Sequence, residues 1–67
     1  MSIDPRAAVS PAAQLAPDVE VGPFAVIGPD VVIGAGCRIG PHAVIQGPTV
    51  IGEGNQVFQF ASIGDAP

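Results

Sequence analysis

His42 is the single histidine of this 67-residue sequence, and its side chain is the obvious candidate for a general base. A general base needs an orienting partner and a substrate pocket. The sequence places Phe24 and Phe60 eighteen residues before and after His42, and no carboxylate in the same pattern. We therefore interpret His42 as a stacking or interface residue, with catalysis and a bystander position in solvent as the alternatives.

Cys37 is the single cysteine, so the chain forms no internal disulfide, which fits a reducing compartment. It occupies a position where small side chains are expected to point inward, which predicts a buried and unreactive thiol. A metal site needs three or four ligands, and one histidine with one cysteine does not supply them. We therefore predict no metal site and no cofactor.

Three further polar features have structural explanations. Asn55 is a polar residue at an inward position and is expected to bond backbone groups near a corner. A ligand contact is the alternative for Asn55, whereas Asp65 is expected to face solvent, with a functional role as the alternative. The Gly-Pro pairs lack the basic residue or helix N-terminus of a phosphate cradle. The sequence therefore predicts no catalytic, cofactor-binding or metal-binding residue.

A six-residue repeat positions all of these side chains. A branched aliphatic residue returns at every sixth position without a miss or an insertion, which sets the fold. Most residues two places earlier are small and apolar, so a short strand with one small and one large inward side chain explains both registers. The aliphatic positions are Ile3, Val9, Leu15, Val21, Ile27, Ile33, Ile39, Ile45, Ile51, Val57 and Ile63.

Glycine and proline mark the bends between these short strands. Glycine usually follows the aliphatic residue, where we expect it to supply a positive φ and a close backbone approach. Proline often comes next, and proline at six-residue spacing excludes a long helix and a wide sheet. The pattern therefore predicts an all-β solenoid in which strands and corners stack in parallel.

Composition and length limit the function further. The formal net charge is −4, with Arg6 and Arg38 as the two basic residues, which argues against nucleic acid and anionic membranes as partners. No apolar run approaches the roughly 18 residues of a membrane span, and no signal peptide is evident, so we expect a cytoplasmic protein. Residues 1–67 read as one β-helix segment. Because it stops partway through a repeat without a polar cap, we expect a truncation of a longer chain.

Several stretches resemble a known family. The aliphatic-Gly frame is similar to that of the hexapeptide-repeat acyltransferase superfamily. Within it, Ile27–Pro29, Ile39–His42, Gly47–Gly52 and Asn55–Gly64 resemble the N-terminal coils of the acyl-carrier-protein–UDP-N-acetylglucosamine O-acyltransferases, and Phe58–Gly64 is the discriminating run. The resemblance covers essentially the whole sequence, but about the first quarter of such an enzyme.

The resemblance implies a left-handed parallel β-helix of about three and a half triangular coils, with three repeats per coil, packed as a homotrimer. The handedness comes from the resemblance, since the general preference for right-handed crossovers predicts the opposite. The implied reaction transfers a 3-hydroxyacyl group from acyl carrier protein to UDP-N-acetylglucosamine, the first step of lipid A biosynthesis, without a metal. The family's catalytic histidine lies in a later coil, so this fragment is expected to be inactive by itself.

Two other functions remain open. One is a self-assembling structural β-solenoid module, whose partners are copies of itself. The other is a related hexapeptide acyltransferase with a different substrate. The residues that would determine the length of the transferred acyl chain are not in this sequence.

Three repeats per coil would stack residues eighteen apart and create three outer faces. A second face would carry Val32 and Val50, and a third would carry Glu20 and Arg38, which are expected to pair. The exposed strand edges at both coil ends predict end-to-end association. The most apolar face is the predicted oligomer face, because exposed apolar patches usually mark interfaces. It carries Phe24, Val26, His42, Val44 and Phe60.

Overall fold

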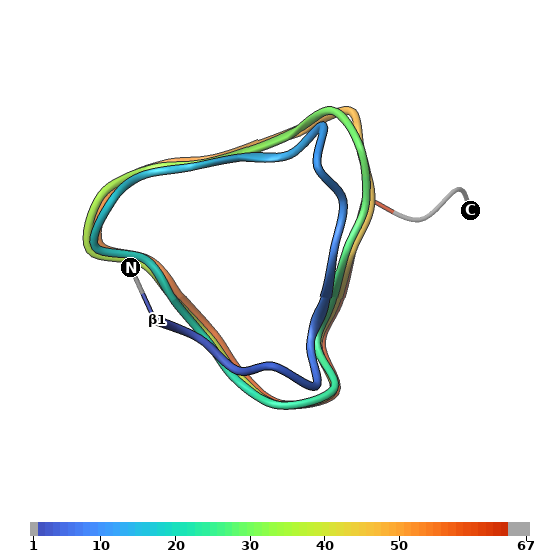
Figure 1. The fold of residues 1–67 in the computed structure, drawn as a ribbon. Coiled ribbons are helices and arrows are strands. Elements are labelled where there is room, and N and C mark those ends of the chain that lie inside the picture. The colour runs from blue at the N-terminus through green and yellow to red at the C-terminus, as the bar shows by residue number, and fades with distance from the viewer. Residues whose placement is uncertain (1, 65–67) are drawn as a thin grey trace.

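A computed structural model describes residues 2–64, which wind into a triangular solenoid (Figure 1). Short strands form the sides of the triangle and turns form its corners. No helix among these residues has the length and apolar character needed to cross a membrane. The strands are β1 (Ser2–Ile3), β2 (Ala8–Val9), β3 (Gln14–Leu15), β4 (Glu20–Val21), β5 (Val26–Ile27), β6 (Val31–Ile33), β7 (Arg38–Ile39), β8 (Val44–Ile45), β9 (Thr49–Ile51), β10 (Gln56–Val57) and β11 (Ser62–Ile63).

The strands form three parallel sheets, one on each side of the triangle. The first sheet has the order β1-β4-β7-β10, the second β2-β5-β8-β11 and the third β3-β6-β9. Each pairing joins residues eighteen positions apart, as between Ile27 and Ile45 in the second sheet. Three repeats therefore make one coil, and the eleven strands of the described chain make about three and two-thirds coils. The predicted parallel solenoid is confirmed.

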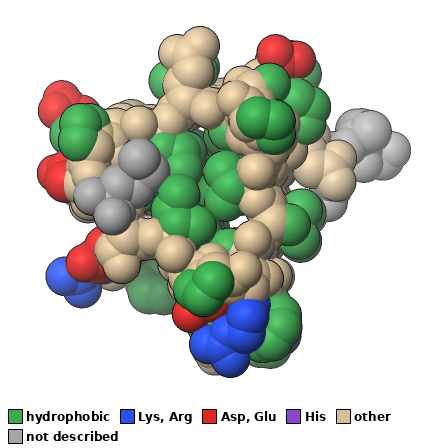
Figure 2. Space-filling view, in the orientation of Figure 1, with side chains coloured by type: hydrophobic (Ala, Val, Ile, Leu, Met, Phe, Trp, Pro, Cys, Tyr) green, Lys and Arg blue, Asp and Glu red, His purple; other side chains and the backbone are tan. Residues whose placement is uncertain are grey.

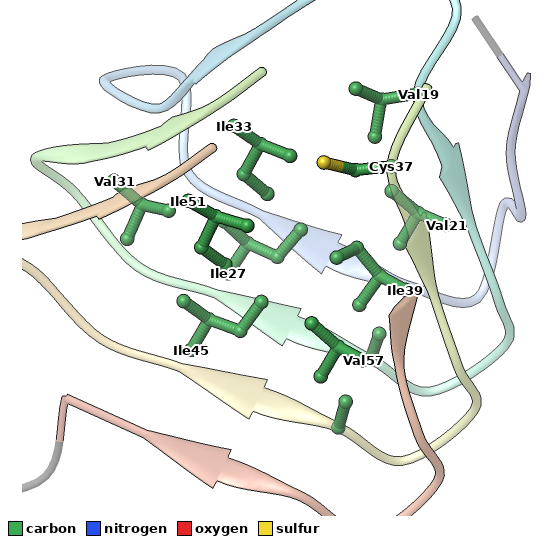
Figure 3. Close-up of a cluster of buried hydrophobic side chains, with 12 residues drawn as sticks. Val19, Val21, Ile27, Val31, Ile33, Cys37, Ile39, Ile45, Ile51 and Val57 are labelled. Atoms are coloured by element: carbon green, nitrogen blue, oxygen red, sulfur yellow. The ribbon is translucent and has the colours of Figure 1, made fainter. Parts of the chain in front are cut away.

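The core is a narrow column of aliphatic side chains along the solenoid axis (Figure 3). The large inward residues Ile27, Ile33 and Ile45 are fully buried, and so are small ones such as Ala25. Burying one valine or isoleucine side chain contributes roughly 1.5–3 kcal/mol, so this column is the main source of stability. Both inward registers of the repeat are confirmed.

Backbone hydrogen bonds join each coil to the next. The N–H of Gly22 donates to the carbonyl of Ile39, and the N–H of Gly28 donates to the carbonyl of Ile45, both at 2.8 Å. In this recurring bond the donor belongs to the earlier coil and the acceptor lies seventeen residues later. The ladder fixes the register, because a slip of one residue would turn the aliphatic side chains outward.

The corner glycines act differently from the prediction. A Cβ on Gly40 would lie 2.8 Å from the backbone nitrogen of Gln59, so the expected close approach of coils is present. The prediction of a positive φ directly after the aliphatic residue is wrong for Gly22 and Gly40. The left-handed residue comes two places later in the corner, as at Phe24 with φ 61° and Gly36 with φ 74°. At Gly22, Gly34 and Gly40 the glycine after the aliphatic residue is thus needed for space, and at Gly64 it does have the predicted positive φ, of 83°.

Replacing Gly40 with alanine should lower the free energy of unfolding by about 1–3 kcal/mol, because its Cβ would press on the next coil. Gly28→Ala is the matched control, since a Cβ there would meet the carbonyl oxygen of Ile45 at an ordinary 3.6 Å. The control should change the free energy by less than about 1 kcal/mol. Urea unfolding followed by circular dichroism measures both, and equal losses would contradict the spacing argument.

Candidate functional site

An aromatic column is the most distinctive outer feature of the solenoid. The rings of Phe24 and His42 are stacked with centroids 5.2 Å apart and planes 17° apart. His42 and Phe60 are stacked in the same way, at 5.2 Å and 15°. We call Phe24, His42 and Phe60 the aromatic column. Both faces of the His42 imidazole are therefore covered by phenyl rings, as the eighteen-residue spacing predicted.

The backbone of the aromatic column is unusual. All three residues have positive φ, at 61°, 60° and 62°, which bulky side chains rarely adopt. Proline precedes Phe24 and His42, and proline followed by a positive φ is the pattern of a type II turn. A left-handed residue other than glycine costs about 1–2 kcal/mol, and each stacked pair returns about 0.5–1.5 kcal/mol. The turn aims each ring at the ring of the next coil.

The aromatic column lies at a different place on the solenoid from the one that the sequence predicted. The sequence placed Phe24, His42 and Phe60 on an outer face, whereas they lie in the turns at the corner between the first and second sheets. Phe24 is 49% exposed and Phe60 is 72% exposed. Val26 and Val44 lie two residues further along, in β5 and β8, on the outer face of the second sheet. The predicted oligomer face is thus one corner together with its adjoining strand face.

Arg6 covers the first ring of the column. Its guanidinium carbon lies 5.2 Å from the centroid of the Phe24 ring, within range of a cation–π contact. Asp4 holds the guanidinium through an ion pair of 3.0 Å and also accepts a bond from the Arg6 N–H. These hydrogen bonds from Arg6 hold the pKa of the Asp4 carboxyl below its usual value, so the carboxyl keeps its charge to lower pH.

The first sheet carries the polar face of the solenoid. Arg38 and Glu20 form the predicted ion pair across adjacent coils at 3.0 Å, with both side chains more than half exposed. Such an exposed pair is worth about 0–1 kcal/mol. A groove of about 520 Å³ crosses this face between the pair and Phe58. Among the described residues that line this groove, Glu20 is the one carboxylate, and it is paired with Arg38.

Cys37 lies in the core, as the sequence predicted. Its side chain is fully buried, and its Sγ lies 3.0 Å from the carbonyl oxygen of Gly52. Figure 3 shows it pointing toward the axis between Val19 and Ile33. A buried thiol without a neighbouring base or cation is inert, so Cys37 acts as a small core residue.

Asn55 bonds the backbone as predicted, with its side-chain amide donating to the carbonyl of Gly52 at 3.0 Å. Although Asn55 stands in the inward register, its side chain is exposed. Asp65 lies outside the described residues. Within residues 2–64, no group of three or more His, Cys, Asp or Glu side chains could hold a metal ion.

The arrangement favours contact rather than catalysis. Over the described part of the chain His42 has ring contacts on both faces and no ion pair with a carboxylate. A general base would need an orienting group and space for a substrate beside the imidazole. The aromatic column instead offers an exposed apolar ridge, of the kind that commonly marks an interface.

Comparison with known proteins gives consistent results. Residues 12–47 match the family described as bacterial transferase hexapeptide (six repeats). The chain is 55% identical over 64 residues to the acyl-[acyl-carrier-protein]–UDP-N-acetylglucosamine O-acyltransferase of Saccharophagus degradans, covering 96% of this chain. LpxA from Acinetobacter baumannii superposes with a TM-score of 0.92 at 47% identity over 96% of this chain. The UDP-N-acetylglucosamine acyltransferase of Francisella novicida gives 0.94 at 45% identity over 97% of this chain.

The chain spans about a quarter of each of these relatives. The aligned part covers 25% of the Saccharophagus protein, 25% of the Acinetobacter chain and 24% of the Francisella chain. The similarity extends over nearly all of the present chain, so the resemblance inferred from the sequence is confirmed for this segment. The remaining three quarters of these relatives have no counterpart in the present sequence.

Removing the central ring should weaken the aromatic column. His42→Ala loses two stacked pairs and should lower the free energy of unfolding by about 1–3 kcal/mol. His42→Phe keeps a flat ring between Phe24 and Phe60 and should lose less than half as much. Chemical denaturation of both variants measures the difference. Equal losses would show that stacking contributes nothing to stability.

Proposed function

The chain belongs to the bacterial transferase hexapeptide family, and we propose that it is the N-terminal β-helix segment of an acyl-carrier-protein–UDP-N-acetylglucosamine O-acyltransferase. The complete enzyme would transfer a 3-hydroxyacyl group from acyl carrier protein to the sugar 3-hydroxyl in the cytoplasm, the first step of lipid A biosynthesis. Its solenoid would be left-handed. The observation that carries the proposal is the 55% identity to the Saccharophagus enzyme over 64 residues.

The segment contributes a scaffold to this reaction. Acyl transfer to a hydroxyl needs a base that removes the hydroxyl proton and a donor that stabilises the developing oxyanion. His42 is sandwiched between two phenyl rings, and the carboxylate of Glu20 is paired with Arg38. Neither group is free to act on a substrate. The coils of this segment would therefore extend the rigid β-helix on which later coils hold the reacting groups.

The function shared by the relatives favours this substrate over that of another acyltransferase with the same fold. The Saccharophagus and Francisella proteins are both named for UDP-N-acetylglucosamine acylation, at 55% and 45% identity.

A graft tests the proposal. The aligned 64 residues of the Saccharophagus enzyme are replaced by the corresponding residues of this chain. Transfer of a 3-hydroxyacyl group from acyl carrier protein to UDP-N-acetylglucosamine should continue at a rate within about tenfold of the parent, a change of at most ~1.4 kcal/mol in the barrier. The isolated 67-residue chain should give no product above the enzyme-free background.

Two variants of the graft serve as controls. His42→Ala in the graft should keep the activity, because we assign no chemistry to that ring. Ile33→Asp places a charge in the core and should abolish activity by disrupting the coils. A graft that folds and assembles like the parent but transfers no acyl group would contradict the proposal.

We also infer that the corner carrying the aromatic column, together with Val26 and Val44, is the oligomer face of the proposed homotrimer. Phe24, Val26 and Phe60 are all more than 40% exposed, so the ridge is open to a partner. Exposed contiguous apolar surface of this kind usually marks an interface. The first sheet, with its Glu20–Arg38 pair, is the face that would remain in solvent.

Replacing Val44 with glutamate should lower the solution mass of the 67-residue chain, because a carboxylate would be buried without a partner at the contact. Gln56→Glu adds the same charge to the polar first sheet and should leave the mass unchanged. Sedimentation equilibrium measures both. An unchanged mass for Val44→Glu, at a concentration where the parent chain is oligomeric, would remove this face from the proposal.

A further inference from the structure

The third side of the triangle is an apolar strip that the proposed scaffold role and the proposed oligomer face leave unused. Its strands β3, β6 and β9 contain no charged residue. Val32 and Val50 point outward from β6 and β9 in one column, and they are 37% and 78% exposed. The next outward position along each strand carries a small residue, at Ala16, Gly34 and Gly52. The strip is therefore flat as well as apolar.

Carboxylates lie at both ends of this strip. Residues 2–64 contain five carboxylates, two of which form the ion pairs with arginine described above. The other three are exposed in the turns on either side of the third sheet. Asp30 lies in the turn before β6, and Asp18 and Glu53 lie in the turns after β3 and β9. Asp18 is held in place because its Oδ1 accepts the N–H of Gly36 at 3.0 Å, which engages one of its two oxygens.

The charges of the described chain are separated around the triangle. The third sheet forms the upper side in the view of Figure 1, and Figure 2 shows acidic side chains at both ends of that side. The arginine side chains appear lower in the same view. Arg38 lies in β7 of the first sheet, and Arg6 lies in the turn between β1 and β2. Within residues 2–64, the third side therefore carries three negative charges and no positive one.

This charge pattern decides what kind of molecule can cover the strip. Two copies of the chain that met through their third sides would bring carboxylates against carboxylates, which costs free energy at a contact. Arg6 and Arg38 of a second copy are already paired with carboxylates, so they do not offset this repulsion. A nucleic acid or an anionic membrane would be repelled in the same way. A partner with an apolar centre and positive charges at its edges matches both the strip and its acidic ends.

The length of the strip fits a short helix. One side of the triangle is one six-residue repeat, which is about 20 Å of extended chain at roughly 3.3 Å per residue. A helix of about 14 residues has the same length, at roughly 1.5 Å per residue. Helices commonly pack an apolar face on the flat face of a sheet. A helix lying across the strip would place its central side chains over the two valines and its two ends beside the two acidic corners.

We propose that the third side of the solenoid docks a basic amphipathic helix of a partner protein, with apolar residues in its middle turns and lysine or arginine at both ends. The apolar face of the helix covers Val32 and Val50. Its cations pair with Asp30 at one corner and with Asp18 and Glu53 at the other. This interaction surface goes beyond the enzymatic role proposed above, because it involves no acyl donor or acceptor.

A peptide titration tests the proposal. The probe is a fluorescently labelled, helix-forming peptide of about 14 residues, with leucines spaced at i, i+3, i+4 and i+7 and two lysines at each end. Fluorescence anisotropy follows its binding to the 67-residue chain. Binding should saturate at one peptide per chain, and the affinity should fall at least roughly fivefold from about 50 to about 500 mM salt, because salt screens exposed charges. The same peptide with glutamate in place of lysine should not bind.

Substitutions at exposed positions locate the contact. Val50→Ser should weaken binding about tenfold, because it removes the most exposed apolar side chain of the strip. Phe58→Ser is its control, since it removes a larger side chain that is 74% exposed outside the third side, and should change the affinity less than about twofold. Asp30→Asn and Glu53→Gln should each weaken binding about threefold, because each removes a charge from one corner. Glu20→Gln changes the net charge equally on the first sheet and should have less than half that effect.

Three results would overturn the proposal. One is an equal loss for Val50→Ser and Phe58→Ser, which would mean that the peptide adheres to any exposed apolar side chain. The second is an equal effect of Glu20→Gln and Glu53→Gln, which would mean that net charge alone attracts the peptide. The third is equal binding of the glutamate peptide. Circular dichroism checks that each variant keeps the fold of the parent chain.

The graft described above separates this proposal from the enzymatic one. The lysine peptide should bind the graft as tightly as it binds the 67-residue chain, because the whole third side is built from the grafted residues. Binding is measured whether or not the graft transfers an acyl group. A graft that is folded but leaves the peptide unbound would show that other parts of the enzyme cover the third side, and would overturn the proposal.

Discussion

The rest of the structure depends on the close stacking of one coil on the next through backbone hydrogen bonds between residues about one coil apart. The bonds from Gly22 to Ile39 and from Gly28 to Ile45 are both 2.8 Å long. They leave room for one large and one small side chain per strand inside the triangle and no more. This explains why the interior is made of isoleucine, valine and alanine, and why the three phenylalanines all lie on the outside or at its corners.

The same stacking creates the surface features. Each outward position of one coil lies over the equivalent position of the next coil, at the strand spacing of about 4.8 Å. Flat rings at Phe24, His42 and Phe60 therefore stack at 5.2 Å, and opposite charges at Glu20 and Arg38 meet at 3.0 Å. The scaffold role that we propose follows from this geometry, because stacked coils form rigid sheet faces and exposed ridges such as the aromatic column. The cost of the left-handed backbone in the aromatic column is offset by the stacking of each ring on the ring of the next coil.

Much of this could be predicted from the sequence. The period of six predicted the short strands and the inward registers of Ile27 and Cys37. Its eighteen-residue columns also predicted that His42 lies between two rings. Two features could not be obtained in this way. The positive φ falls on Phe24 and His42 rather than on Gly22 and Gly40, because corner geometry depends on how the next coil fits, which no single-residue preference describes. Asn55 is exposed although it stands in the inward register, because exposure depends on the packing around a residue and not on its register alone.

Scalar couplings across hydrogen bonds, measured by NMR on ¹³C,¹⁵N-labelled chain, test the stacking of coils most directly. The account predicts a coupling between the amide nitrogen of Gly28 and the carbonyl carbon of Ile45, and another between Gly34 and Ile51. Couplings that join neighbouring repeats, six or twelve residues apart, would contradict it, because they would replace the stacked coils with hairpins.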